Sequence, residues 1–234
     1  MNRMFKRTTR CALTIGVLGA SLCATPTAFA QDRAPTVKFS QPVAGPGLPT
    51  PRLTSAGPTT IAADAADDRG LASVVFSAGS RVLCTVTAAP FQCPFQPQAQ
   101  DVGTTTLIAR ATDIAGLTAT DVRDVQVDSF QPSAITMRVR NRRDRRAPYR
   151  FSVSGGLQLP AGVTPAEVCF GGSVLVTAKS GRREENETAQ ISRNCTYRLS
   201  ILTQRARRIS LTAQFAGNRF LQDVLSRRSV VRAG

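Results

Sequence analysis

The stretch LIARATDIAGLTATDVRDVQV, residues 107–127, decides the fold, because it predicts two β-strands joined by a turn. Apolar residues alternate with residues that tolerate solvent, and residues 113–116 supply the turn. A hairpin of this kind must bury one face against a second sheet, so it predicts a packed all-β domain that ends near residue 128. The alternating apolar residues are Leu107, Ala109, Ala111, Leu117, Ala119, Val122, Val125 and Val127.

The residue composition supports short strands and disfavours several kinds of catalysis. The 234-residue chain is 42% hydrophobic, which is enough for folded domains with hydrophobic cores. Its 17 Gly and 14 Pro are typical of a chain with many short strands and turns. The chain has no His, which removes the commonest general base, the usual zinc ligand and the Ser-His or Cys-His pairs of hydrolases. We therefore expect a protein that is not an enzyme. The alternative is an enzyme with an unrecognised carboxylate site, for which the candidates are Asp64, Asp67, Asp68 and Asp113.

Residues 1–30 predict a cleaved signal peptide. A basic start with four Lys or Arg residues precedes an uncharged apolar run at residues 11–24, and residues 28–30, AFA, form a small-x-small cleavage site. A membrane anchor is the alternative, but this run is shorter than the roughly 20 residues that cross a bilayer. We expect a mature chain that begins at Gln31, has no transmembrane segment and is secreted or held at the cell surface.

The cysteines predict two disulfides. Removing the signal peptide leaves four of the 6 cysteines, an even number in a chain sent to an oxidising compartment. Four cysteines allow three connectivities, but two local pairs each lie within one half of the chain. We therefore expect the bonds Cys84–Cys93 and Cys169–Cys195, while the alternative of a metal site is disfavoured by the absence of His and of any CxxC spacing.

Charge divides the mature chain into two unlike halves. Residues 31–130 carry 7 basic and 9 acidic residues, a net charge of −2, whereas residues 131–234 carry 19 basic and 6 acidic residues, a net charge of +13. This boundary coincides with the end of the hairpin at residues 107–127.

The residues before that hairpin predict further short strands. A passage rich in Pro and Gly at residues 41–55 is expected to be a loop or an irregular edge. Val74 and Phe76 are expected to share an inward face. Seven strands in about 95 residues is the spacing of a β-sandwich. The strands expected before the hairpin lie at residues 34–40, 59–65, 71–77, 81–87 and 90–95.

Three segments resemble bacterial immunoglobulin-like domains of extracellular proteins. They are IAADAADDRGLASVVF at residues 61–76, APFQCPF at residues 89–95 and ARATDIAG at residues 109–116, and their order and spacing agree with that family. The resemblance covers roughly residues 35–128 and implies an immunoglobulin-like sandwich over residues 31–128. The chain lacks the core Trp and the intersheet cysteine spacing of antibody domains.

The second half is expected to form another immunoglobulin-like sandwich, residues 134–234, after a linker at residues 129–133. A strand at residues 149–159 is expected to be interrupted by Gly155 and Gly156. Residues 141–148 are expected to form a basic turn, residues 180–186 and 204–208 polar turns, and residues 160–167 a loop or one helical turn. The ending, residues 213–231, resembles the terminal strand pair of bacterial immunoglobulin-like repeats. The other expected strands lie at residues 134–140, 173–179, 188–192, 195–202 and 209–215.

Asp67, Asp68 and Asp113 are candidate ligands for a calcium ion. In a sandwich of this strand order their turns fall at the same end, where carboxylate oxygens can bind Ca²⁺. The alternative is that each Asp caps its own turn. That end lies away from the expected linker, so a bound ion would not stiffen the junction.

The arginines of residues 138–150 are candidate ligands for polyanions, because guanidinium groups bind phosphate and carboxylate in a bidentate manner. Specific nucleic-acid recognition is not expected, because only Tyr149 supplies an aromatic ring near this cluster. The alternative is a set of solvated hairpin tips. The candidate residues are Arg140, Arg142, Arg143, Arg145 and Arg146.

Together these features predict an all-β protein with two tandem immunoglobulin-like β-sandwich domains after a cleaved signal peptide. We expect a binding or spacer module at the cell envelope, with adhesion as one role. Its expected partners are anionic envelope polymers, glycans or surface proteins. A carbohydrate-binding or accessory part of an extracellular enzyme system is the alternative. No cofactor is expected apart from the calcium ion considered for the Asp turns.

Overall fold

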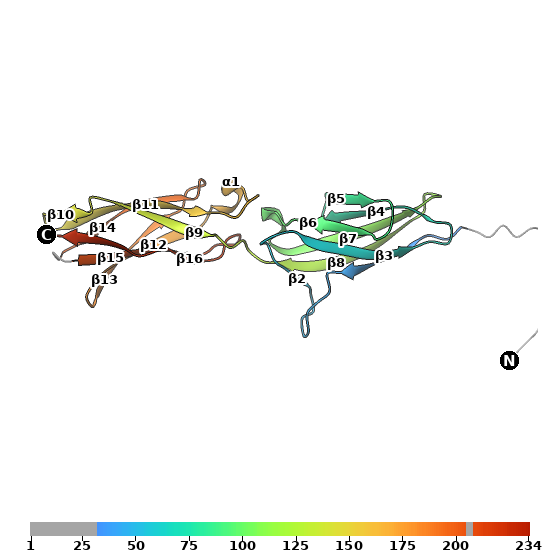
Figure 1. Ribbon diagram of the computed structural model, residues 1–234, viewed down its shortest axis with the longest axis horizontal. Helices are drawn as coiled ribbons and strands as arrows, with labels where there is room; N and C mark the ends of the chain where they lie inside the picture. Colours follow the sequence, from blue (N-terminus) through green and yellow to red (C-terminus); the bar gives the residue numbers. More distant parts are fainter. Residues whose placement is uncertain (1–31, 205–207) are drawn as a thin grey trace, which may run out of the picture. The chain divides into compact units, whose positions relative to one another are not determined.

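The structure is a computed structural model that describes residues 32–204 and 208–234, and the expected signal peptide lies outside them. Strands make up most of the described chain, with one four-residue α-helix and one short 3-10 helix (Figure 1). The predicted all-β class is confirmed. In the described residues no helix is long and apolar enough to cross a membrane.

The first half of the described chain is a β-sandwich. Its two sheets have the strand orders β1-β3-β6 and β2-β8-β7-β4-β5. Phe39, Ile61 and Phe95 of the first sheet and Phe76 and Leu107 of the second are buried between them. The elements are β1 (Thr36–Gln41), β2 (Arg52–Leu53), β3 (Thr59–Ala66), β4 (Leu71–Ala78), β5 (Arg81–Val86), β6 (Gln92–Phe95), a 3-10 helix (Ala99–Asp101), β7 (Gly103–Asp113) and β8 (Thr118–Val127).

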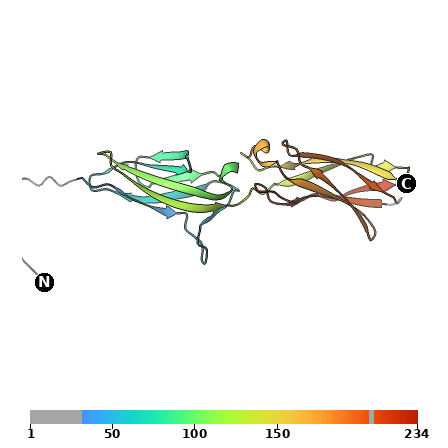
Figure 2. The same ribbon diagram turned by 180° about the vertical axis from the view of Figure 1, so that it is seen from behind.

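The predicted hairpin is formed by β7 and β8, which run along this sandwich in both views (Figure 1 and Figure 2). Leu107, Ala109 and Ala111 are fully buried, as the alternation requires. The expectation for β8 was partly wrong, because Leu117 and Val122 are 39% and 57% exposed. Leu117 precedes the strand, and Val122 has the parity of the outward residues.

The inward positions of β8 include two charged residues that hold β1. Asp121 Oδ2 accepts a hydrogen bond of 2.8 Å from the Phe39 backbone N–H. Arg123 donates to the carbonyl oxygens of Phe39 and Pro42 at 2.8 and 2.7 Å, and its guanidinium lies 5.4 Å from the centre of the Phe39 ring. β1 is an edge strand that pairs only with β3 in its sheet. The side chains of Asp121 and Arg123 therefore bond backbone groups of β1 that a second neighbouring strand would otherwise bond.

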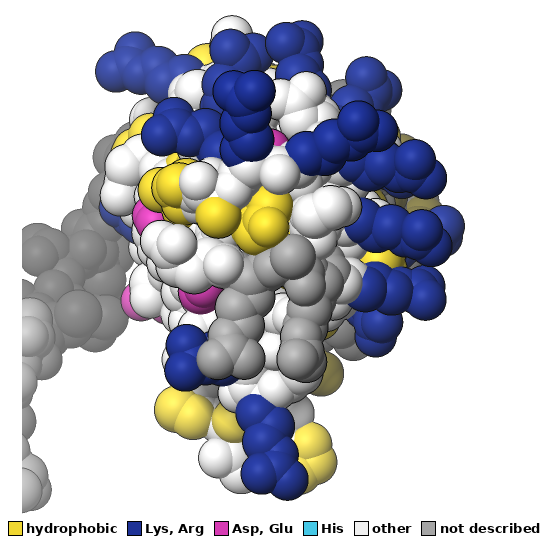
Figure 3. All heavy atoms as spheres, turned by 90° about the vertical axis from the view of Figure 1, so that its left-hand side faces the viewer, with side chains coloured by type: hydrophobic (Ala, Val, Ile, Leu, Met, Phe, Trp, Pro, Cys, Tyr) yellow, Lys and Arg dark blue, Asp and Glu magenta, His cyan; other side chains and the backbone are white. Residues whose placement is uncertain are grey.

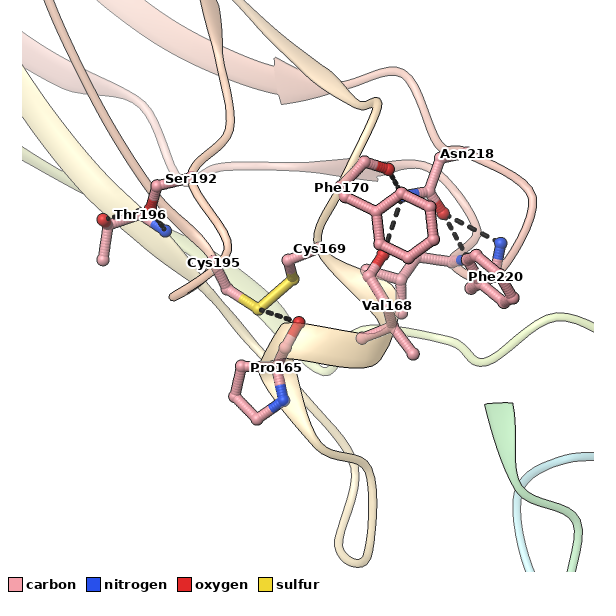
Figure 4. The surroundings of a disulfide bond; sticks show 10 residues. Pro165, Val168, Cys169, Phe170, Ser192, Cys195, Thr196, Asn218 and Phe220 are labelled. Atoms are coloured by element: carbon pink, nitrogen blue, oxygen red, sulfur yellow. Dashed lines mark hydrogen bonds between the residues drawn. A yellow bond between two sulfur atoms is a disulfide. The ribbon is translucent and has the colours of Figure 1, made fainter. Parts of the chain in front are cut away.

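Both expected disulfides are present. Cys84 of β5 is bonded to Cys93 of β6, so this bond joins the two sheets of the first sandwich. Cys169 is bonded to Cys195, which joins the end of the short helix α1 (Pro165–Val168) to a turn 26 residues further along the chain (Figure 4).

The second half is also a β-sandwich. Its sheets have the strand orders β14-β11-β9 and β10-β17-β15-β12-β13, with β16 paired to β15. Phe151, Ile201, Leu211 and Phe215 are fully buried in its core. The strands are β9 (Ala134–Arg140), β10 (Arg143–Asp144), β11 (Tyr149–Gln158), β12 (Ser173–Ser180), β13 (Arg183–Gln190), β14 (Thr196–Thr203), β15 (Arg208–Phe215), β16 (Val224–Leu225) and β17 (Ser229–Ala233).

Phe130 lies within the expected linker, residues 129–133, but packs as part of the second core. Its side chain is 1% exposed, and its backbone N–H donates to the Phe220 carbonyl oxygen at 2.8 Å. The packing of the second half therefore begins at Phe130, before β9.

Two expectations for the second half were wrong. β11 runs through Gly155 and Gly156 without interruption. A Cβ built on Gly155 would lie 1.9 Å from the Thr136 carbonyl oxygen and 2.8 Å from Tyr197 Cε1. Gly155 is thus required for close approach, since Tyr197 covers it and donates a 3.0 Å hydrogen bond to that same oxygen.

The second correction concerns the polar turn expected at residues 180–186. β13 already begins at Arg183, and its pairing with β12 extends back to the partners Ser180 and Arg183. The charged sequence REENE conceals this strand, because β13 lies at the edge of its sheet, where charged side chains reach solvent.

Asn218 stabilises the end of the second sandwich that holds the Cys169–Cys195 bond (Figure 4). Its side-chain amide donates to the carbonyl oxygens of Val168 and Phe170 at 2.8 and 3.2 Å. Its oxygen accepts hydrogen bonds from the backbone of Phe220 and Leu221 at 2.9 and 2.8 Å. One side chain thus connects the α1 turn to the loop after β15.

Replacing Gly155 with Ala is expected to lower the free energy of unfolding of the second sandwich by about 1–3 kcal/mol, because the added methyl overpacks the site and displaces Tyr197. Denaturant unfolding of the mature chain measures this change. Ser154→Ala, a neighbouring outward position, is the control and is expected to change it by less than about 0.5 kcal/mol. Equal effects of the two variants would contradict the proposed close approach.

The first sandwich is expected to fold alone, because β1–β8 enclose a core of their own residues. A chain of residues 31–129, which leaves Phe130 to the second core, is expected to show a cooperative thermal transition by circular dichroism. If this chain stayed unfolded while the full mature chain folded, the halves would not be independent domains.

Candidate functional site

The turns that contain Asp67 and Asp113 lie side by side at one end of the first sandwich. Leu71, which follows the first turn, pairs with Asp113 at the end of β7. The Ile114 backbone N–H also donates to the Gly70 carbonyl oxygen at 3.2 Å.

Each of these two carboxylates caps its own turn. Asp67 Oδ2 accepts hydrogen bonds from the backbone N–H groups of Arg69 and Gly70, both at 2.9 Å. Asp113 is 2% exposed, and its Oδ1 accepts from the backbone of Ala115 and Leu117 at 2.9 and 2.8 Å. This is the local bonding that Asp provides in tight turns.

The three predicted calcium ligands do not form one group in the described residues. Asp68 is exposed. Arg69 Nε lies 3.2 Å from Asp32 Oδ1, so a cationic side chain already lies beside these turns. Asp67 Oδ1 and Asp113 Oδ2 are buried without a hydrogen-bond partner. Across residues 32–204 and 208–234, no group of three or more Asp, Glu, Cys or His side chains is placed to hold a metal ion.

The carboxylates considered for an enzyme are spread over separate positions. Asp64 is exposed on β3 and Asp68 is exposed in the following turn. Asp67 and Asp113 each use one oxygen to cap a turn. Two of the four candidates therefore face solvent, and the other two bond the backbone of neighbouring turns.

The predicted polyanion-binding arginines lie around an ordered turn between β9 and β11. Arg140, Arg142, Arg143, Arg145 and Arg146 are all exposed. The backbone beneath them is not a free hairpin tip, because β10 pairs with the C-terminal strand β17. The Arg232 N–H donates to the Arg142 carbonyl oxygen at 2.9 Å, and the Gly234 N–H donates to that of Asp144 at 2.7 Å.

The side chain of Asp144 accepts hydrogen bonds from the backbone of this turn. Its carboxylate accepts backbone hydrogen bonds from Arg150 at 2.7 Å and from Arg146 at 3.2 Å. These two hydrogen bonds hold the pKa of Asp144 below its ordinary value of 3.8. Because the folded-state pKa is lowered, the stabilisation is present above pH 3.8 and is lost as the pH falls through the folded-state value.

The fold adds basic residues from distant parts of the sequence to the same end of the second sandwich. Arg143 pairs with Arg232, Arg232 with Arg208, and Lys179 with Ser210. Figure 3 looks onto this end and shows Lys and Arg side chains gathered over its upper and right-hand parts. We call this set the basic end: Arg140, Arg142, Arg143, Arg145, Arg146, Arg150, Lys179, Arg182, Arg183, Arg208 and Arg232.

Few acidic groups offset the basic end. Asp144 is used within the turn, and Glu184 forms a 2.6 Å ion pair with Lys179. Sequence spacing missed Lys179, Arg182 and Arg183, because only the strand register brings them to the same end. The resulting surface can attract polyanions through its summed field and through guanidinium contacts.

Comparison with known families identifies the first sandwich. Residues 35–109 match the family model described as a bacterial Ig domain. The resemblance expected from the three sequence segments is therefore confirmed over these residues. No curated protein matches the sequence.

Several solved structures resemble the chain at low sequence identity. The fibronectin(III)-like modules of Clostridium thermocellum CbhA are 15% identical, with 85% of this chain and 93% of that chain covered and a TM-score of 0.35. The chicken interferon gamma receptor alpha chain is 10% identical, with coverage of 86% and 98% and a TM-score of 0.41. Parabacteroides merdae beta-glucuronidase is 9% identical, with coverage of 86% and 24% and a TM-score of 0.31.

Replacing Asp113 with Ala is expected to lower the free energy of unfolding by about 1–3 kcal/mol, because two backbone N–H groups lose their acceptor. Asp68→Ala, an exposed position, is the control and is expected to be close to neutral. Thermal unfolding in calcium and in a chelator completes the measurement. Equal midpoints in the two solutions agree with turn capping, whereas a calcium-dependent rise that Asp113→Ala abolishes would establish the ion site.

Proposed function

We propose that this protein is an exported, non-catalytic binding or spacer module of the cell envelope, and that its basic second sandwich is attracted to anionic polymers. The observation that carries this proposal is the basic end, where the fold concentrates residues from β9, β10, β12, β13, β15 and β17. The second half has 19 basic and 6 acidic residues, so its field favours anionic partners.

Three further features support export and a binding role. Residues 35–109 match a bacterial Ig domain, and three segments of the sequence resemble such domains of extracellular proteins. Two disulfides suit an oxidising compartment. The chain has no His, which is the residue most used for general acid and base catalysis.

The test compares two variants of the mature chain that lose the same charge. The tip variant changes Arg142, Arg145 and Arg146 to Ser, and the control variant changes Arg33, Lys38 and Arg110 of the first sandwich to Ser. All six side chains are exposed, so both variants are expected to fold. Retention on immobilised inorganic polyphosphate is measured at low and moderate salt.

The tip variant is expected to lose retention several-fold and to depend less on salt, because charge attraction is screened over about 8 Å at physiological ionic strength. The control variant is expected to behave as the unchanged chain does. If the unchanged chain were not retained at low salt, the proposed attraction to polyanions would be wrong and the spacer role would remain.

A further inference from the structure

The sheet β14-β11-β9 presents a regular outward face to solvent. Burial alternates along β9 and β14 and over residues 149–154 of β11, so the side chains that do not enter the core point outward together. The central strand β11 contributes small residues, Ser152, Ser154 and Gly156, to the middle of this face. The full set of outward residues, here called the arginine face, is Thr136, Arg138, Arg140, Arg150, Ser152, Ser154, Gly156, Gln158, Thr196, Arg198, Ser200 and Leu202.

The strand register places small side chains along the middle of this face and longer side chains on both sides of them. Ser154 pairs with Arg138 on one side and with Arg198 on the other. Neighbouring strands are about 4.8 Å apart, so these two arginines begin about 10 Å apart with a serine between them. One step along β11, Ser152 pairs with Arg140 and Ser200.

Two hollows on the surface coincide with this strip of small side chains. One has a volume of about 700 Å³ and is lined by residues that include Arg138, Ser154, Gly156 and Arg198. The other has a volume of about 160 Å³ and is lined by Arg140, Ser152, Val153, Ser154 and Arg198. Ser154 and Arg198 line both hollows, so the two adjoin along β11, and together they are called the groove.

The chemistry of the groove is cationic and polar. The arginine face contains four Arg residues and neither Asp nor Glu. In the described part of the chain, none of the four forms a salt bridge. The outward residues of this face include no aromatic ring, and Tyr197, which lines the larger hollow, is only 3% exposed, so the face offers no open ring on which a nucleobase could stack.

We propose that this groove binds an extended phosphate-bearing polymer without bases, which lies along β11 between the arginines. This proposal rests on the proposed function. It assigns the binding of the polymer to the groove and not to the basic end as a whole. Arg138 and Arg198 clamp one phosphate over Ser154, since guanidinium groups bind phosphate oxygens in a bidentate manner. Arg140 and then Arg150 receive the phosphates that follow.

The spacing of the arginines sets the repeat that the groove accepts. Outward positions two residues apart along a strand are separated by about 6.8 Å. Arg138 and Arg140 are such a pair on β9. A flexible chain with phosphates at this interval can therefore place consecutive phosphates beside consecutive arginines. In inorganic polyphosphate neighbouring phosphates share one oxygen and lie closer together, so alternate phosphates would lie beside consecutive arginines, and the small side chains of β11 leave room for the links between them.

The first test separates the groove from net charge. The face variant changes Arg138, Arg140 and Arg198 to Ser in the full mature chain, and it loses the same charge as the tip variant. Affinity for soluble inorganic polyphosphate is measured by titration at several salt concentrations. The face variant is expected to bind at least about tenfold more weakly, and the tip variant only a few-fold more weakly.

The second test changes the shape of the groove and keeps its charge. Ser154→Tyr places a bulky side chain on the floor, where a β-strand tolerates an aromatic residue. It is expected to weaken binding at least about fivefold. Thr120→Tyr, at an exposed position of β8 in the first sandwich, is the control and is expected to bind as the unchanged chain does.

The outcomes distinguish this inference from the broader proposal. Equal losses in the face and tip variants, with full binding by Ser154→Tyr, would overturn the groove but keep attraction to the basic half. No binding by the unchanged chain would overturn both. Tighter binding of a single-stranded oligonucleotide with the same number of phosphates would also contradict the inference, because it would assign the face to nucleic acid. Thermal unfolding of every variant verifies that it is folded.

Discussion

The two-residue period of the β-strand is the constraint on which the rest of this structure depends. In the second sandwich, burial of Phe151 and Val153 in the core fixes Ser152 and Ser154 on the outer surface. The same parity in β9 buries Ile135 and turns Arg138 and Arg140 outward. A one-residue change of register would reverse both sets, so the core and the arginine face are specified together.

The parts of the fold that sequence could predict are local and periodic. The β7–β8 hairpin was predictable because Leu107, Ala109 and Ala111 alternate without exception up to a turn marked by Asp and Gly. Both disulfides were predictable because an even number of cysteines divides into two local pairs. The capping role of Asp113 was foreseen as the alternative to calcium binding, since Asp bonds its own turn.

What sequence could not predict depends on contacts between distant residues. Asp121 and Arg123 have the composition of a solvent-facing strand, yet they bond to β1 from more than 80 residues away. The charged residues of β13 suggest a turn in the sequence, and only the pairing with β12 shows that they form a strand. Gly155 looked like an interruption, because its requirement for Gly comes from two distant groups, the Thr136 carbonyl oxygen and the Tyr197 ring. The sequence predicted only part of the basic end, because the strand register decides which basic residues lie together.

The acidic residues of the second sandwich are unevenly distributed, because half of them lie on β13. Glu184, Glu185 and Glu187 are three of its 6 acidic residues, and they lie in the sheet opposite the arginine face. A body with this charge distribution has a dipole moment and experiences a torque near a charged surface, besides the net attraction. Near an anionic surface, such a torque would orient the sandwich before any specific contact forms.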